Sequence, residues 1–154
     1  MPTKYPASVL VDTNILLRVV TQASPLHGVT TGALRKLLDN DVNVYICPQN
    51  MQEFRQVATR PLASNGFGWT SAQTAAAMNR IEADFSVVQE TPSIYATWRR
   101  IVELTGATGR ANFDARIVAI AEVNSIAAVM TFESAAFARY GAVTNVVILD
   151  PATI

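Results

Sequence analysis

The sequence predicts an α/β fold in which helices cover both faces of a central parallel sheet. Short stretches rich in β-branched and apolar residues alternate along the chain with longer stretches of helical periodicity. The apolar stretches contain no alternating polar residues, which is typical of parallel strands buried on both faces. The connections are short, so we expect consecutive elements to pack together in a single domain over residues 1–154.

Strand and helix signals alternate in the first half of the chain. Residues 8–12 include two β-branched valines in an apolar run that ends abruptly, as in a buried strand. Pro48 suits the first turn of a helix, and Pro, Asn-Gly and Gly mark the loop that follows. We expect Leu34, Leu37 and Leu38 to share one helix face. The expected elements are a strand at 8–12, helices at 14–21 and 25–39, a strand at 43–47, a helix at 48–59 and a loop at 60–69.

The second half continues the same pattern. Thr70 or Ser71 is expected to cap one helix, Pro92 to open the next, and Asn112 to cap a third. The expected elements are a helix ending near 84, a strand at 85–89, a helix at 92–105, a loop at 106–110, a helix ending near 124, a strand at 126–131, a helix at 133–140 and a strand at 145–149.

Composition limits the class of protein. Twelve basic and twelve acidic residues cancel, so no global positive field indicates nucleic-acid binding, which would need local arginines or metal ions. Only 16% of residues are charged, which suggests that some surface meets another protein. The single cysteine, Cys47, is expected to be a buried apolar residue, in keeping with a reducing cytoplasm. No apolar stretch is long enough to span a membrane, and the start, MPTKYPAS, lacks a signal-peptide core.

Four acidic residues stand apart from the rest. Asp12 ends the first strand, Glu53 lies one turn into the helix after the second strand, Asp114 lies in a first helical turn, and Glu133 follows a strand. Each has an ordinary structural role open to it. Asp12 could cap a helix, Asp114 and Glu133 could complement a helix dipole, and Glu53 could pair with Arg60. Together, however, three of the four fall at ends of elements that should converge at the ligand-binding edge of a parallel sheet.

A converged acidic cluster needs a cation or protons. Two carboxylates ~5 Å apart repel by roughly 3 kcal/mol at an effective dielectric of ~20. Three such pairs approach ~10 kcal/mol, which is comparable to the stability of a whole domain. Ligands with oxygen atoms alone favour Mg²⁺ or Mn²⁺. His27, the only histidine, has no acid or cysteine near it in the sequence, which argues against zinc and Ser-His-Asp chemistry, and no phosphate-binding glycine motif is present.

The chain resembles the PIN-domain nucleases, and among them the VapC-like toxins of bacterial toxin–antitoxin pairs. The resemblance lies in VLVDTNILLRVV, PQNMQEFRQVATRP, NFDARIVAIAEVNSIAAVMTFESAAFARY and VVILDP, in that order, over residues 8–151. It implies a PIN-like α/β/α sandwich with a parallel sheet of about five strands. It also implies a metal-dependent endoribonuclease with Mg²⁺ or Mn²⁺, as one or two ions.

The resemblance carries over a set of site residues. The implied acids are Asp12, Glu53 and Asp114, with Asn14 and Thr131 as polar supports, and the fourth acidic position falls on Glu133. Two departures are visible. Ala136 stands where an acid is often seen in the family, which bears on a second metal position, and Phe113 stands where relatives often have a histidine.

The resulting hypothesis gives each group a role. Asp12, Glu53 and Asp114 hold the ion, partly through water. Glu133 completes the site or orients a second ion. Metal-bound water attacks the RNA phosphodiester. Arg60, Arg110 and Arg116 are candidates for phosphate contacts, although they could equally be solvated or pair with acids. Phe67 and Trp69 could stack on bases or pin their loop, and Trp98 is expected in the core or at an interface.

Three other functions stay open on the sequence alone. A catalytically impaired PIN-fold module would bind RNA or protein without turnover, and Glu133 and Ala136 favour it. A Mg²⁺-dependent phosphatase often has a second Asp where Asn14 stands. An adaptor would use its acids only as helix caps. The expected partners of the nuclease are RNA, a small antitoxin that covers the site, and a second copy in a homodimer.

Overall fold

Five short parallel strands form the centre of the molecule. In the computed structural model, which describes residues 3–154, they lie in the order β3-β2-β1-β4-β5, and every neighbouring pair is parallel. Their bounds are β1 Ser8–Val11, β2 Asn43–Ile46, β3 Ser86–Val87, β4 Ala128–Met130 and β5 Val147–Leu149. The expected parallel sheet is confirmed, and β1 is its central strand.

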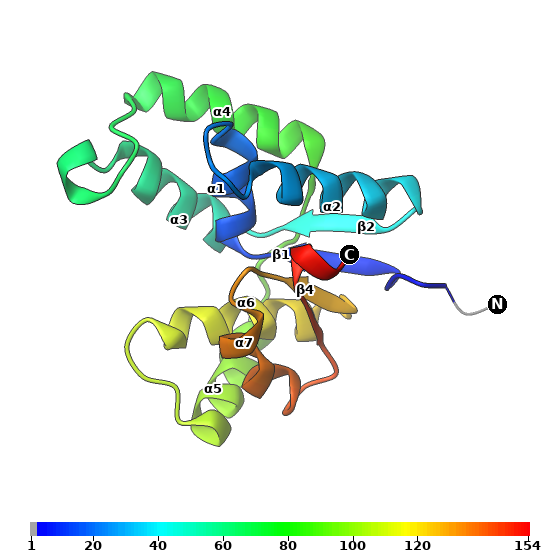
Figure 1. Ribbon diagram of the computed structural model, residues 1–154. Coiled ribbons are helices and arrows are strands. Elements are labelled where there is room, and N and C mark those ends of the chain that lie inside the picture. The colour runs from blue at the N-terminus through cyan, green and yellow to red at the C-terminus, as the bar shows by residue number, and fades with distance from the viewer. Residues whose placement is uncertain (1–2) are drawn as a thin grey trace.

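Helices cover both faces of the sheet, which confirms the three-layer α/β/α architecture. Figure 1 shows α1 to α4 on one side of the sheet and α5 to α7 on the other. The helices of the described residues are α1 Thr13–Val20, α2 His27–Asp39, α3 Pro48–Thr59, α4 Ser71–Asp84, α5 Ser93–Thr105, α6 Ala111–Val123 and α7 Ser134–Gly141, with 3-10 turns at Leu62–Ser64 and Pro151–Thr153. None of these helices is long and apolar enough to cross a membrane.

The alternation of side chains along the strands builds two separate cores. Val9 and Val11 point to the face covered by α1 to α4, whereas Leu10 points to the face covered by α5 to α7. All three side chains are fully buried, as expected for a central parallel strand. Because both faces of β1 are buried, a ligand can approach this strand only at its ends, and the acidic residue Asp12 follows its carboxyl end.

Two local expectations are wrong. Asn112 does not cap α6: Arg110 holds the N-cap position, and Asn112 Nδ2 donates instead to the Gly109 carbonyl at 2.9 Å, because the left-handed turn at Gly109 starts the helix earlier. Leu38 does not share the buried face of Leu34 and Leu37 and is 51% exposed, since successive residues differ by about 100° around a helix. The strands at 85–89 and 126–131 are also shorter than expected.

The loop after α3 is fixed by packing. Phe67 packs against Trp69, with ring centroids 5.1 Å apart, and Trp69 meets Phe54 edge-on at 6.3 Å. The loop folds back tightly on the end of α3, where a Cβ at Gly66 would collide with the Arg60 carbonyl. Phe67 and Trp69 therefore pin the loop, and their rings are engaged within the protein.

Candidate functional site

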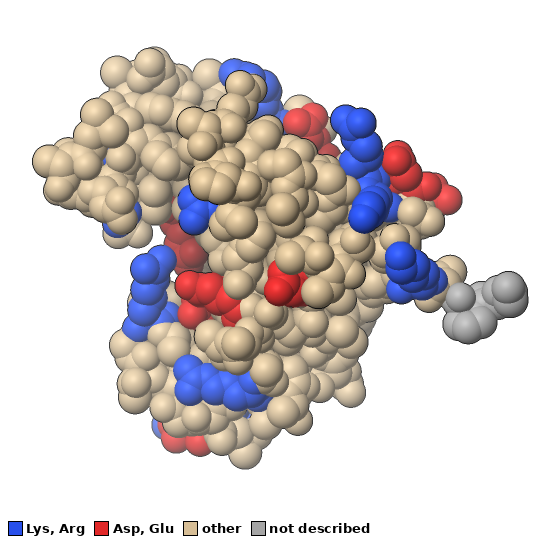
Figure 2. All heavy atoms as spheres, viewed as in Figure 1, with Lys and Arg blue, Asp and Glu red and all other residues tan. Residues whose placement is uncertain are grey.

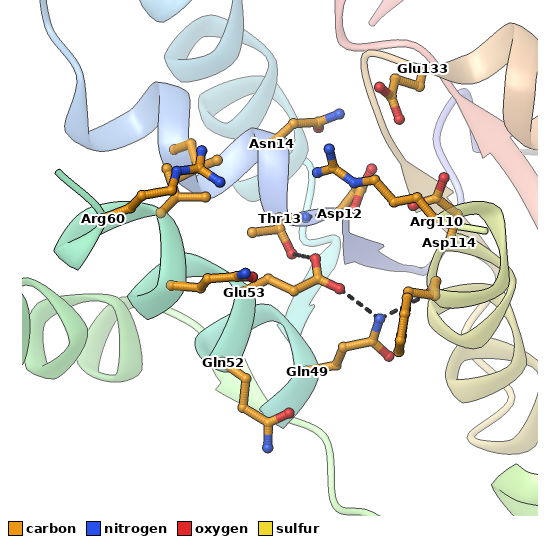
Figure 3. Close-up of a pocket in the computed structure, with 14 residues that line it drawn as sticks. Asp12, Thr13, Asn14, Gln49, Gln52, Glu53, Arg60, Arg110, Asp114 and Glu133 are labelled. Atoms are coloured by element: carbon orange, nitrogen blue, oxygen red, sulfur yellow. Dashed lines mark hydrogen bonds between the residues drawn. The ribbon is translucent and has the colours of Figure 1, made fainter. Parts of the chain in front are cut away.

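Polar side chains from both helical layers meet in one pocket at the carboxyl edge of the sheet. Asp12, Glu53, Asp114 and Glu133 all line this acidic pocket, whose volume is about 480 Å³. Figure 2 shows acidic side chains gathered in a hollow between the two helical layers, with basic side chains at its margins. The fold therefore brings together the four acids that the sequence singles out, as the close-up in Figure 3 shows.

Asp12 lies buried at the bottom of the acidic pocket, and we call Asp12 and Glu53 together the floor of the pocket. Asp12 is 5% exposed and follows β1 directly, and its backbone N–H donates to the Met130 carbonyl at 2.9 Å. Its Oδ1 accepts from the Thr13 backbone N–H at 2.7 Å, and its Oδ2 accepts from the Thr131 hydroxyl at 2.8 Å. Asp12 does cap α1, as its ordinary role requires, yet one carboxylate face still lines the pocket.

Burial makes the ionised form of Asp12 costly. Its pKa is raised to about 7, chiefly by desolvation, with the charges of Asp114 and Glu53 adding to the rise and the hydrogen bonds from Thr131 and Thr13 opposing it. Within residues 3–154, neither of the two ion pairs involves Asp12. The protein thus keeps a carboxyl group in a place where it needs either a proton or a cation.

Thr131 orients Asp12 through a hydroxyl whose bonding is complete. Its Oγ1 accepts from Asn14 Nδ2 at 3.2 Å and from the Glu133 backbone N–H at 3.0 Å. Two accepted bonds leave the hydroxyl proton for Asp12 Oδ2. Asn14 and Thr131, the two polar supports that the resemblance implies, thus lie in one hydrogen-bonded group with Asp12.

Glu53 is held from two sides. The Thr13 hydroxyl donates to Oε2 at 2.7 Å, and Gln49 Nε2 donates to Oε1 at 2.7 Å. Asn50 Nδ2 in turn donates to the Thr13 hydroxyl at 3.2 Å, which directs the Thr13 proton to Glu53. The alternative in which Glu53 pairs with Arg60 is wrong, because no such ion pair forms among the described residues.

Gln49 connects Glu53 to the opposite helical layer. Besides Glu53, its Nε2 donates to the Phe113 carbonyl at 2.9 Å, as the dashed lines in Figure 3 mark. Its Oε1 accepts from Arg116 at 3.1 Å. Arg116 is itself held by both carboxylate oxygens of Glu90, at 2.7 and 3.3 Å. We call Glu90, Arg116 and Gln49 the polar relay.

The polar relay changes the expected role of Arg116. Its guanidinium is engaged by Glu90 and Gln49, and it does not line the acidic pocket. Of the three candidate arginines, only Arg60 and Arg110 line it. Arg60 donates to the Asn65 carbonyl at 2.9 Å, and in Figure 3 the exposed Arg110 extends from α6 toward the middle of the pocket.

Gln49, Thr13 and Asn50 are site residues that sequence reasoning missed. A signal was present for Gln49, which lies four residues before Glu53 and so one helical turn away on the same face. Thr13 adjoins Asp12 in the sequence, but nothing in the sequence shows that its hydroxyl points to α3.

Asp114 and Glu133 form the rim of the pocket. Asp114 lies in the first turn of α6, and burial, followed by the charges of Glu133 and Glu53, raises its pKa to about 6, against the opposing effect of Arg110 and Arg139. Glu133 precedes α7 and is exposed, and its side chain makes no capping hydrogen bond. Neither carboxylate has a side-chain hydrogen bond like those that hold Asp12 and Glu53.

The donor set of the pocket fits a hard divalent cation. All four candidate ligands are carboxylates, and the buried Asp12 gains most from a nearby positive charge. Among residues 3–154, no three His, Cys, Asp or Glu side chains lie close enough together to ligate one ion jointly. Bound Mg²⁺ usually keeps several waters. This spacing therefore suits an ion that one or two carboxylates bind directly, while the other carboxylates bind its waters.

Comparison with known proteins places the chain among toxin–antitoxin structures by fold. A chain of VapBC2 from Rickettsia felis, bound to a promoter DNA fragment, superposes with a TM-score of 0.69 at 14% identity, covering 93% of this chain and 98% of that one. A chain of VapBC-1 from nontypeable Haemophilus influenzae gives 0.67 at 18% identity, covering 94% and 98%.

A third structure, VapBC-5 from Mycobacterium tuberculosis, is described as a member of the VapBC family of toxin–antitoxin systems. It gives a TM-score of 0.61 at 20% identity, covering 94% of this chain and 99% of that one. No curated protein matches the chain. The model of the PIN domain family matches residues 9–143, which include every candidate acid of the pocket. The chain therefore belongs to the PIN domain family.

Proposed function

We propose that the chain is a divalent-metal-dependent endoribonuclease, the toxin of a toxin–antitoxin pair acting in the cytoplasm. The observation that carries the proposal is the buried, hydrogen-bonded Asp12, whose pKa is raised to about 7 and which faces Glu53 and Asp114 across one open pocket. A carboxylate buried in this way is stabilised by a divalent cation. Membership of the PIN domain family and the VapBC fold support the nuclease class.

Each side chain then has a defined task. Asp12 and Glu53, both fixed by hydrogen bonds, would hold Mg²⁺ or Mn²⁺, with Asp114 and Glu133 acting on it or on a second ion through water. The bound ion supplies charge stabilisation at the phosphorus centre and lowers the pKa of water. Thr131 and Asn14 keep the Asp12 carboxylate in place.

Arg110 and Arg60 would hold the RNA. Both line the acidic pocket from opposite helical layers, so an RNA phosphate between them would sit above the carboxylates. Arg116 belongs to the polar relay and would act on Glu53 through Gln49 rather than on RNA. A small antitoxin is the partner that the VapBC likeness suggests, and the low share of charged residues suggests a second copy of the chain as another partner.

A second candidate is a PIN-fold module that binds without cutting. The observation that favours it is the spacing of the acids, since no three of them in residues 3–154 are grouped to ligate one ion jointly. Metal-dependent turnover separates the two candidates.

The test compares cleavage of single-stranded RNA by the wild-type protein, by Asp12→Asn and by a matched control, Asp39→Asn, which changes an exposed acid at the end of α2. We expect Mn²⁺-dependent cleavage by the wild type and the control, and loss of cleavage in Asp12→Asn with an unchanged circular dichroism spectrum. Mn²⁺ binding with no turnover by pure wild-type protein would instead support the binding module.

A further inference from the structure

A second hollow adjoins the acidic pocket and has the opposite chemistry. We call it the aromatic pocket; it has a volume of about 360 Å³ between the starts of α5 and α6 and is lined by Pro92, Ile94, Tyr95, Trp98, Phe113 and Arg116. Phe113 lines both pockets, since it precedes Asp114 in the first turn of α6. A polymeric ligand that occupies the acidic pocket can therefore extend directly into the aromatic pocket.

Trp98 and the backbone of Phe113 are held in place. Trp98 Nε1 donates to the Asn112 carbonyl at 2.7 Å, and the centroids of Tyr95 and Trp98 lie 5.9 Å apart. The Phe113 carbonyl accepts from Gln49, which anchors the backbone of this residue to the polar relay. A ligand that enters the aromatic pocket therefore meets one fixed ring, Trp98, with Tyr95 packed beside it.

Two of these rings face solvent. Tyr95 is 64% exposed and Phe113 is 60% exposed, whereas Phe67 and Trp69, the other candidates for base stacking, pack within the protein. The exposed aromatic surface thus lies beside the candidate catalytic acids and not on the loop that the sequence suggested.

Charge and size define the occupant. Arg116 is the only charged residue that lines the aromatic pocket, and Glu90 neutralises it through two hydrogen bonds. A flat, uncharged group suits this environment better than a phosphate or an ionised side chain. The hollow is bounded by few residues, whereas a stable dimer interface buries about 800 Å² per partner, so it suits one ring of a larger ligand.

We propose that the aromatic pocket binds one unpaired nucleobase of the RNA whose phosphodiester lies in the acidic pocket. The base would stack on the rings of Tyr95 and Phe113. Stacking of this kind tolerates any sequence, because every base has a flat aromatic face. The inference rests on the proposed function and adds to it a preference for single-stranded RNA, because a base within a duplex cannot enter the hollow.

The test measures binding of a short fluorescein-labelled single-stranded RNA by anisotropy, in Ca²⁺, with the RNA checked for integrity afterwards. The variants are Tyr95→Ala and Phe113→Ala. Tyr95→Phe keeps the ring, and Leu104→Ala removes an exposed apolar side chain elsewhere on α5. We expect Tyr95→Ala and Phe113→Ala each to weaken binding about 5- to 100-fold, in keeping with stacking energies of about 1–3 kcal/mol per base, with little effect of the other two changes.

An abasic scan of the RNA links the effect to a base. Removing one base, at a fixed distance from the cleaved bond, should weaken wild-type binding at least as much as Tyr95→Ala does, and should have a smaller effect on that variant, in which the base can stack on Phe113 alone. As a second readout, the Trp69→Phe variant leaves Trp98 as the only tryptophan, and its emission should change with intact RNA but not with RNA abasic at that position.

The contrary results are distinct. If Tyr95→Ala and Phe113→Ala bind RNA normally but change the sedimentation of the protein, the aromatic pocket is an interface between copies and the base subsite is wrong. If the wild type cleaves RNA and no abasic position matters, the subsite is wrong while the nuclease stands. If the wild type neither binds nor cleaves RNA, the proposed function fails together with the subsite.

Discussion

The floor and the rim of the acidic pocket contain the same chemical groups but hold them differently. On the floor, Asp12 and Glu53 each accept two hydrogen bonds from side chains or backbone of neighbouring elements. On the rim, Asp114 and Glu133 stand at helix starts with no comparable support, and Glu133 is exposed. The floor carboxylates are therefore fixed in position without a ligand, whereas the rim carboxylates can change position when a ligand binds.

An empty site costs most at Asp12. Desolvation raises the pKa of Asp12 to about 7 and that of Asp114, on the rim, to about 6, so both carboxylates are penalised when no cation is bound, and Asp12 more than Asp114. We therefore expect the largest effects on stability and activity at Asp12 and the smallest at the exposed Glu133.

The largest effect is expected for Asp12→Asn. The variant removes the charge best placed to bind a cation, so RNA cleavage should fall by about 1,000-fold or more, within the range of single catalytic groups. Initial rates with Mn²⁺ and a single-stranded RNA measure the loss. Cleavage within about tenfold of the wild type would show that Asp12 is not a floor ligand.

The pH dependence of stability provides the next test. With a folded pKa of about 7 and an ordinary value of 3.8, Asp12 binds a proton in the folded protein at pH values where it is ionised in the unfolded chain. The free energy of unfolding of metal-free protein should therefore fall as the pH rises from about 4 to about 7, by about 2–4 kcal/mol. Asp114, whose pKa is raised to about 6, acts in the same direction.

Urea denaturation across this pH range measures the slope, and Asp12→Asn should flatten most of it. At pH 8 without metal, the variant should also be more stable than the wild type, because it lacks the buried charge. The gain is reduced by about 1 kcal/mol, because the asparagine amide does not match the hydrogen bond from Thr131. A wild-type protein that gains stability between pH 4 and pH 7 would contradict the burial cost assigned to Asp12.

A smaller effect is expected at the polar relay. Gln49→Leu leaves Glu53 Oε1 without its donor and removes the bond from Arg116 to Gln49, so activity should fall about 10- to 100-fold, as for other residues that orient metal ligands. The matched control is Gln22→Leu, which changes an exposed glutamine that does not line the acidic pocket. Steady-state kinetics should show the change mainly in kcat, and equal losses in both variants would remove the orienting role of Gln49.

The smallest effect is expected on the rim. Glu133→Gln should lower activity by less than about tenfold, because this exposed carboxylate acts on the ion through water if it acts at all. Titration of activity with Mn²⁺ measures the change. A loss as large as that of Asp12→Asn would make Glu133 a direct ligand and would reverse the distinction between floor and rim.

Sequence reasoning located the floor better than its supports. Asp12 could be placed because an apolar strand that is buried on both faces exposes only its carboxyl end. The resemblance placed Glu53 and Asp114 by register, and the structure brings all three to one pocket. The strand order, with β1 in the centre, explains why Asp12 and Thr131 meet although 119 residues separate them.

Two errors concern contacts with distant segments. Arg116 looked available for RNA, but Glu90, 26 residues earlier, reaches it from the segment before α5. Phe67 and Trp69 looked available for bases, whereas Trp69 packs against Phe54 of α3 and Phe67 packs against Trp69. The local sequence does not mark these partners.

The error at Asn112 is local. The left-handed turn at Gly109, three residues earlier, moves the helix start and leaves Arg110 at the N-cap position.

The most direct measurement is calorimetric titration of the metal-free protein with Mn²⁺ at pH 7 in two buffers of different ionisation enthalpy. Since Asp12 is partly protonated there, the wild type should bind Mn²⁺ and release a fraction of a proton, and Asp12→Asn should lose both the affinity and the proton release. Binding of equal strength in both proteins, or no binding by the wild type, would contradict a cation site built on Asp12.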